Sequence, residues 1–125
     1  MYTKTSIEAG NRVWRSPLWR HSSFGADVRR DWRLAEEKRG PCRVCGAWPV
    51  DLANTMGKAW QDVEQEDGSM LVVPDSVIPL CASHHRLYDS YILNILPCLT
   101  REEVANAVES VGEIRAARRR LTADA

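Results

Sequence analysis

Residues 42–45 read Cys-Arg-Val-Cys and residues 79–85 read Pro-Leu-Cys-Ala-Ser-His-His, and these two stretches are the most informative part of the sequence. They place Cys42-x-x-Cys45 before Cys81-x-x-His84, with 35 residues between the two pairs. Thiolates joined by one imidazole suit a tetrahedral zinc ion with closed coordination, which is a structural rather than a catalytic site. Such an ion adds stability that a small hydrophobic core lacks. The sequence therefore predicts a structural Zn²⁺ ion bound by Cys42, Cys45, Cys81 and His84.

The alternative for the cysteines is a redox pair at Cys42 and Cys45, with His84 as a surface residue. A redox Cys-x-x-Cys expects a thioredoxin-like βαβ context, and the surrounding pattern does not supply one. Cys98 has no partner at ligand spacing, so we interpret it as a small, buried apolar residue.

Length and composition predict one soluble domain. The chain has 125 residues, of which 44% are hydrophobic and 27% charged, and 17 basic side chains balance 17 acidic ones. No run approaches the roughly 20 apolar residues that cross a membrane, and the first residues lack the apolar core of a signal peptide. We therefore expect a cytoplasmic protein without a membrane segment. Cysteines in that reducing compartment favour metal binding over disulfides.

The neutral total hides an uneven charge distribution. Residues 1–40 carry nine Lys and Arg against five Asp and Glu, whereas residues 41–99 carry three against seven. The basic part includes an extended arm, residues 1–24, in which arginines alternate with aromatic residues. If the partner is double-stranded DNA, the predicted phosphate contacts are Arg12, Arg15, Arg20, Lys58 and Arg86. Trp14 and Trp19 would then stack on bases, or alternatively pack in the core or against a partner subunit.

Residues 25–125 are interpreted as a single domain. The predicted parts are a helix over 25–39, a zinc-bound core over 40–95 and a C-terminal helix over 100–121. Within the core we expect a β-hairpin between 50–56 and 70–73, a polar loop over 57–69 and a helix over 82–93. Thr100 and Glu103 have the spacing of a capping box, which marks the start of the last helix.

A second metal site is suggested by His85 and Asp89. They are four residues apart, so on a helix their side chains lie on one face, where they can bind a divalent cation. The alternative is an ordinary exposed helix contact.

Together, these motifs resemble those of the HNH endonucleases, and small phage-type members in particular. The likeness covers roughly residues 40–100. It implies an α+β fold with a zinc-stapled ββα-metal core and flanking helices. The family's zinc knuckles correspond to the four ligands above. Its helical metal ligands correspond to His85 and Asp89, although many members place a histidine at the second position.

Two positions depart from the family pattern. The family's general-base histidine, which ends the first strand, corresponds to Asn54, and its middle asparagine corresponds to Ser76. An amide cannot accept a proton from water near neutral pH. Ala53 also leaves empty a position where other members carry a metal ligand.

The resemblance implies hydrolysis of DNA phosphodiester bonds with one Mg²⁺ or Mn²⁺ ion. Asn54, natural or engineered, predicts slow or absent cleavage. The rival is a non-catalytic zinc-containing DNA-binding module, or an accessory of phage assembly and packaging. A third interpretation is a zinc-stabilised protein-interaction domain. A phage-type protein would work in the host cytoplasm, and a homodimer would suit cleavage of both strands.

Overall fold

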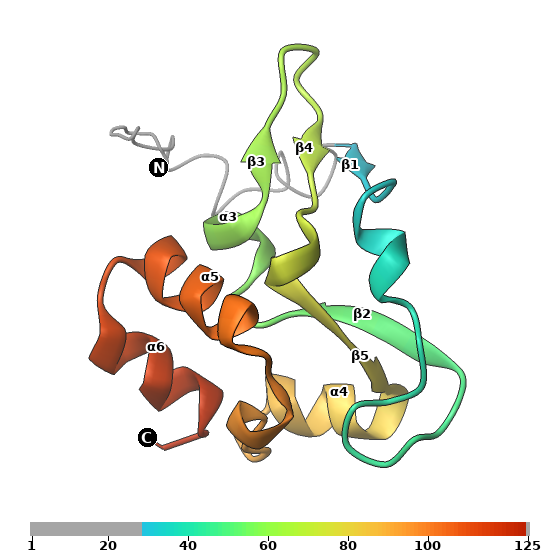
Figure 1. Ribbon diagram of the computed structural model, residues 1–125, viewed down its shortest axis with the longest axis vertical. Helices are drawn as coiled ribbons and strands as arrows, with labels where there is room; N and C mark the ends of the chain where they lie inside the picture. Colours follow the sequence, from blue (N-terminus) through green and yellow to red (C-terminus); the bar gives the residue numbers. More distant parts are fainter. Residues whose placement is uncertain (1–28, 125) are drawn as a thin grey trace.

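The computed structural model describes residues 29–124. Within that range the chain forms a small α+β fold with four α-helices and two small sheets (Figure 1). The strands are β1 (Arg30–Asp31), β2 (Val50–Asn54), β3 (Val63–Glu64), β4 (Met70–Leu71) and β5 (Val77–Cys81). The α-helices are α3 (Lys58–Gln61), α4 (Ala82–Asp89), α5 (Arg101–Val111) and α6 (Ile114–Leu121). Short 3₁₀ turns are η1 (Ala35–Lys38), η2 (Pro74–Ser76) and η3 (Leu96–Cys98).

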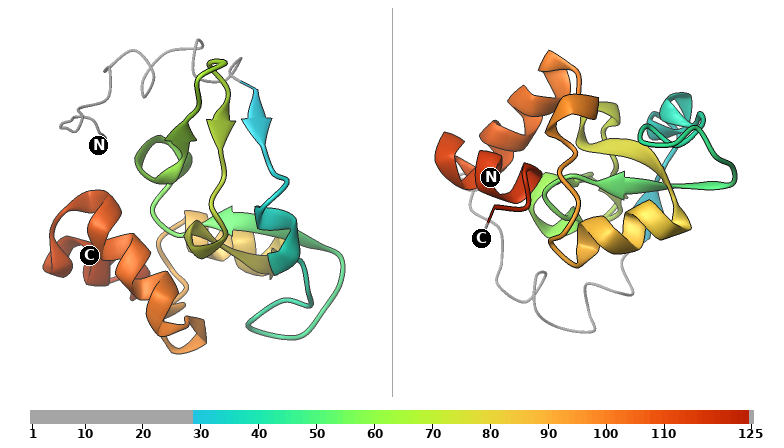
Figure 2. Two further views of the ribbon diagram at one scale, coloured as in Figure 1. Left: turned by 45° about the horizontal axis from the view of Figure 1, so that its top comes forward. Right: turned by 90° about the horizontal axis from the view of Figure 1, so that it is seen from below.

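The centre of the fold is the antiparallel pair of β2 and β5, with α4 alongside (Figures 1 and 2). The helix α4 starts immediately after β5, and its buried Tyr88 packs in one cluster with Ala53 of β2 and Ile78 of β5. Leu52 and Val77 belong to a second cluster, which covers the opposite face of the pair. The two strands and one helix are thus packed as a ββα unit.

The predicted hairpin is wrong in its second strand. β2 pairs with Val77–Cys81, whereas Met70–Leu71 forms β4 in the other sheet, between β1 and β3. The first four residues of β5 are buried, so this strand presents an unbroken apolar run rather than an alternating one. Pro79 within the run also obscures the strand signal, because proline lacks the N–H of a regular ladder.

The predicted helix over 25–39 is also wrong within the described residues. Arg30–Asp31 forms a strand parallel to β4, and helical structure is confined to the short η1 turn. The backbone N–H of Val72 donates to the carbonyl of Asp31 at 3.0 Å, so the strand pairing takes the hydrogen bonds that a helix would use. Residues 25–28 and the predicted arm over 1–24 lie outside the described part of the chain.

The predicted C-terminal helix is present as two helices. The capping box of Thr100 and Glu103 begins α5, as expected, but Gly112 ends it with a left-handed φ of 78°. Such a conformation is strained for residues with a side chain, so glycine sets the break. The predicted helix over 82–93 is shorter than expected and ends at Asp89. Among the described residues, no helix combines the length and apolar character needed to span a membrane.

Candidate metal sites

The four predicted zinc ligands come from three neighbouring elements. Cys42 and Cys45 lie in the turn before β2, Cys81 ends β5, and His84 is in the first turn of α4. The N–H of Cys42 donates to the carbonyl of Ala47 at 3.0 Å, which closes the turn. The N–H of Arg43 donates to the carbonyl of Pro79 at 3.0 Å, so the turn is fastened directly to β5.

The ligand atoms of these residues have the spacing of one tetrahedral site. All four lie within 4.8 Å of one another, close enough to hold a metal ion. Sγ of Cys45 is 3.8 Å from Sγ of Cys81, and Nδ1 of His84 is 3.6 Å from Sγ of Cys42 and 3.3 Å from Sγ of Cys81. Tetrahedral zinc with ordinary bond lengths requires separations of about 3.5–3.8 Å. The prediction that these residues form one site is confirmed, and the distances are consistent with structural zinc.

The electrostatics of the cluster also favour a cation. Burial opposes ionisation of Cys42, but N–H groups of Cys81, Cys45 and Val44 outweigh it and lower the pKa of the thiol to about 6. The N–H of Ala47 favours the thiolate of Cys45, yet burial and the adjacent sulfur atoms raise its pKa. Neighbouring thiolates repel one another, and a bound cation removes that repulsion.

The second predicted site is only partly assembled. His85 follows His84 on α4, and its Nε2 is 3.4 Å from Oδ2 of Asp89. A carboxylate that the sequence analysis missed, Asp51 of β2, lies on the other side of the ring, with Oδ2 3.0 Å from Nδ1. Asp51 faces Leu80 in the β2–β5 register, and this places it on the same side as α4. Alternation along β2 places Asp51 and Ala53 on one face, but the proximity of Asp51 to His85 depends on how β2 packs against α4.

Asn54 does not point to His85. It is opposite Val77 in the register, and residues paired across strands share one face of a sheet. Its Oδ1 accepts a hydrogen bond from Nη2 of Arg30 at 2.9 Å, and its Nδ2 donates to Oε1 of Gln61 at 3.2 Å. These partners belong to β1 and α3. Arg30 is itself held by the buried Asp62, through Nε at 2.7 Å from Oδ2.

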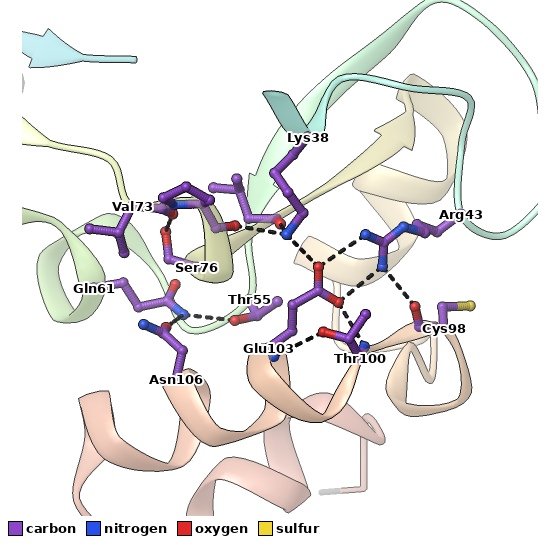
Figure 3. Close-up of polar contacts among 12 residues, drawn as sticks. Lys38, Arg43, Thr55, Gln61, Val73, Ser76, Cys98, Thr100, Glu103 and Asn106 are labelled. Carbon is purple, nitrogen blue, oxygen red and sulfur yellow. Dashed lines mark hydrogen bonds and ion pairs between the residues drawn. The ribbon is translucent and has the colours of Figure 1, made fainter. Parts of the chain in front are cut away.

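The remaining predicted site residues are scattered around this core. Ser76 is fully buried, and its hydroxyl donates to the carbonyl of Val73 at 2.7 Å, which stabilises the η2 turn (Figure 3). Lys58 on α3 and Arg86 on α4 are both exposed. Arg12, Arg15 and Arg20 lie outside the described residues. Cys98 is partly buried, so it is less enclosed than predicted.

A buried ionic cluster supports the turn at 42–45, and sequence analysis missed it. Glu103 of α5 accepts from Nη1 and Nη2 of Arg43, each at 3.0 Å, and forms an ion pair with Lys38 of η1 (Figure 3). Burial opposes the charge, but Arg43, Lys38 and the N–H of Thr100 outweigh it and lower the pKa of Glu103 to about 2. Because Arg43 lies between Cys42 and Cys45, this cluster fixes the turn that presents them.

Comparisons of the chain with protein-family models, curated proteins and solved structures find no match. Any functional assignment therefore depends on the residues and geometry described above.

Proposed function

We propose that this chain is a metal-dependent DNA endonuclease of HNH type, slowed at the position of its general base. The observation that carries the proposal is His85, which directly follows Cys81-x-x-His84 in the sequence and lies on α4 beside Asp89. The packing of α4 against β2 and β5, with the Cys and His cluster joining them, supports a zinc-stapled ββα-metal core. Zn²⁺ is assigned to the cluster because thiolate-rich tetrahedral sites favour it.

His85 and Asp89 are the proposed ligands of a catalytic Mg²⁺ or Mn²⁺ ion. An imidazole and a carboxylate on one helix face offer it a nitrogen and an oxygen donor. The cation would supply Lewis-acid stabilisation of the scissile phosphate. Lys58 and Arg86 are exposed, and their positive charge would position the DNA backbone.

Asn54 explains why cleavage should be slow. Its amide cannot take a proton from water, and its side chain is already bonded to Arg30 and Gln61. Losing general-base assistance typically lowers the rate about 10²- to 10⁴-fold. The side chain of Asn54 lies on the face of β2 away from His85, although the carbonyl of the next residue, Thr55, accepts a hydrogen bond from Tyr88 of α4.

The test is cleavage of supercoiled plasmid with Mg²⁺ or Mn²⁺, comparing the unchanged chain, Asn54→His and Asn54→His combined with His85→Ala. We expect Asn54→His to nick the plasmid at least 10²-fold faster than the unchanged chain, the lower end of general-base assistance. The double variant should lose that gain, because it lacks the proposed cation ligand. If Asn54→His binds the plasmid but does not cut it, the proposal of a nuclease disabled at one position is wrong.

A non-catalytic DNA-binding or phage-assembly module is the second candidate. The engagement of Asn54 by Arg30 and Gln61 favours it, because these bonds give Asn54 a structural role. The surface of α6 also favours this second candidate, because a shallow groove there is lined by the exposed Arg115, Arg118 and Arg119. If the unchanged chain and Asn54→His both bind the plasmid and neither cuts it, that result would support this candidate.

A further inference from the structure

The carboxylate of Asp51 faces His85 directly, although Asp51 is not one of the proposed cation ligands. Its Oδ2 is 3.0 Å from Nδ1 of His85, and Oδ2 of Asp89 is 3.4 Å from Nε2 of the same ring. Asp51 comes from β2, whereas both of its neighbours in this group come from α4. The ring therefore lies between carboxylates on its two opposite edges.

We propose that Asp51 is a positioning residue that orients His85 for the divalent cation. The inference rests on the proposed cation site at His85 and Asp89, and adds to it a residue from the opposite element. With a neutral imidazole, Nδ1–H donates to Asp51 and the lone pair of Nε2 is left facing Asp89. A histidine ligand commonly donates its other N–H to a carboxylate, which fixes the tautomer and makes the ligand nitrogen more basic.

Asp51 is a supporting residue rather than a third ligand because of where it lies. Asp51 and Asp89 contact different ring nitrogens, so their oxygens cannot meet at one ion that His85 also binds. The only group of three or more ligand atoms gathered closely enough for a shared ion, within residues 29–124, is the Cys and His cluster. Asp51 thus acts on the cation only through the ring.

The location of His85 makes such support necessary. Its backbone is fixed by α4 and by the adjacent cluster residue His84, and its side chain is 28% exposed. The helix fixes the direction in which the side chain of His85 leaves the backbone, since successive residues project about 100° apart. It does not fix the side-chain torsion angles that orient the imidazole ring. Asp51 fixes the remaining rotation from the neighbouring strand, which couples the geometry of the site to the β2–α4 packing.

The experiment measures Mn²⁺ binding to the zinc-loaded protein by calorimetry, with the unchanged chain, Asp51→Ala and Asp51→Asn. Mn²⁺ is the probe because it binds thiolate sites far more weakly than zinc and leaves the cluster intact. We expect Asp51→Ala to weaken Mn²⁺ binding about tenfold, the lower end for a lost supporting carboxylate, because Asp51 is largely exposed. Asp51→Asn retains an acceptor oxygen for Nδ1–H and should weaken Mn²⁺ binding by a smaller factor than Asp51→Ala.

A matched control variant and a second measurement distinguish an effect on the orientation of the His85 ring from the loss of one negative charge. Glu109→Gln on α5 removes the same charge from an exposed position and should leave Mn²⁺ affinity unchanged. Ring ¹⁵N shifts of His85, measured without Mn²⁺ at a pH where the ring is neutral, should report the Nδ1–H tautomer. In Asp51→Ala these shifts should move toward the Nε2–H tautomer, with zinc content unchanged.

Two results would overturn the inference: unchanged Mn²⁺ affinity in Asp51→Ala, or a His85 tautomer that does not depend on Asp51. A chain that binds no Mn²⁺ would overturn the proposed cation site together with the role given to Asp51. By contrast, Asp51-dependent Mn²⁺ binding without plasmid cleavage would uphold the inference while the proposed nuclease activity fails.

Discussion

Glu103 joins three parts of the chain through one buried carboxylate. It pairs with Lys38 of η1 and Arg43 of the turn at 42–45, and it also accepts a hydrogen bond from the N–H of Thr100 to complete the cap of α5. The side chain of Glu103 is 1% exposed, whereas those of Lys38 and Arg43 are 16% and 26% exposed. Removing the anion would leave the cations inside a poorly hydrated site. Glu103 therefore stabilises the fold through contacts with residues far away in the chain, which no local sequence pattern predicts.

We expect Glu103→Gln to lower the free energy of unfolding by about 3 kcal/mol, the lower end for breaking a buried ion pair. Chemical denaturation at neutral pH with zinc present would measure it. Glu109→Gln, an exposed change on the same helix, should alter stability by less than about 0.5 kcal/mol. A variant as stable as the unchanged chain would show that the carboxylate contributes little.

The same carboxylate predicts a pH dependence. Its pKa is lowered from 4.5 to about 2, so its contribution is present in full above pH 4.5 and is lost as the pH falls toward 2. The stability difference between the unchanged chain and Glu103→Gln should therefore shrink across that range. Because both proteins share the same Cys and His cluster, taking the difference cancels the acid sensitivity of that cluster.

Among the elements, α6 is fastened to α4 by one arginine. The guanidinium of Arg120 lies 3.8 Å from the ring centre of Tyr88 and 4.2 Å from that of Tyr91. Nη1 of Arg120 is buried and has no hydrogen-bond partner among the described residues, so the aromatic faces are its main favourable surroundings. Arg118, Arg119 and Arg120 are consecutive in the sequence, and positive charge in the last turn of a helix is favourable in general. In the structure, Arg120 is instead an interhelical contact.

Arg120→Ala should destabilise the protein by about 1–2 kcal/mol through loss of the cation–π contacts. Arg119→Ala is the matched control, because this neighbour is exposed and should change stability much less. Thermal or chemical unfolding of both variants beside the unchanged chain would decide the point. Equal effects of the two substitutions would contradict the role given to Arg120.

The sequence predicts those features that depend on residues close together in the chain, and it does not predict those that depend on contacts between distant residues. The gathering of Cys42, Cys45, Cys81 and His84 at one site and the Thr100 cap both follow from short-range spacing, and the structure confirms both. The partner of β2 and the strand at Arg30–Asp31 depend on pairing between distant residues, which periodicity does not encode. The face on which Asn54 lies depends on the same register. Asp51 was missed for this reason: its proximity to His85 exists only once β2 and α4 pack together.

At the scale of the whole molecule, a metal ion bound by the Cys and His cluster would close the chain into a loop that contains β2, β3 and β4. It joins the turn at 42–45 to the β5–α4 junction, and every residue between them lies within this closed loop. The buried apolar side chains divide into two modest clusters on opposite faces of the β2–β5 pair. A small core with few layers gains much of its stability from such a cross-link.

Metal removal should therefore unfold the protein rather than only loosen one turn. We expect the purified chain to contain a single zinc ion by elemental analysis, and a strong chelator to abolish its far-ultraviolet helical signal and its cooperative unfolding. Cys42→Ser should have the same effect, because a hydroxyl is a poor zinc ligand and Cys42 is buried in the first cluster. Cys98→Ser is the matched control: it removes a thiol outside the ligand set and should retain both zinc and the fold. A folded, zinc-free protein, or a Cys42→Ser variant as stable as Cys98→Ser, would show that packing and the Glu103 cluster hold the ββα unit together without the ion.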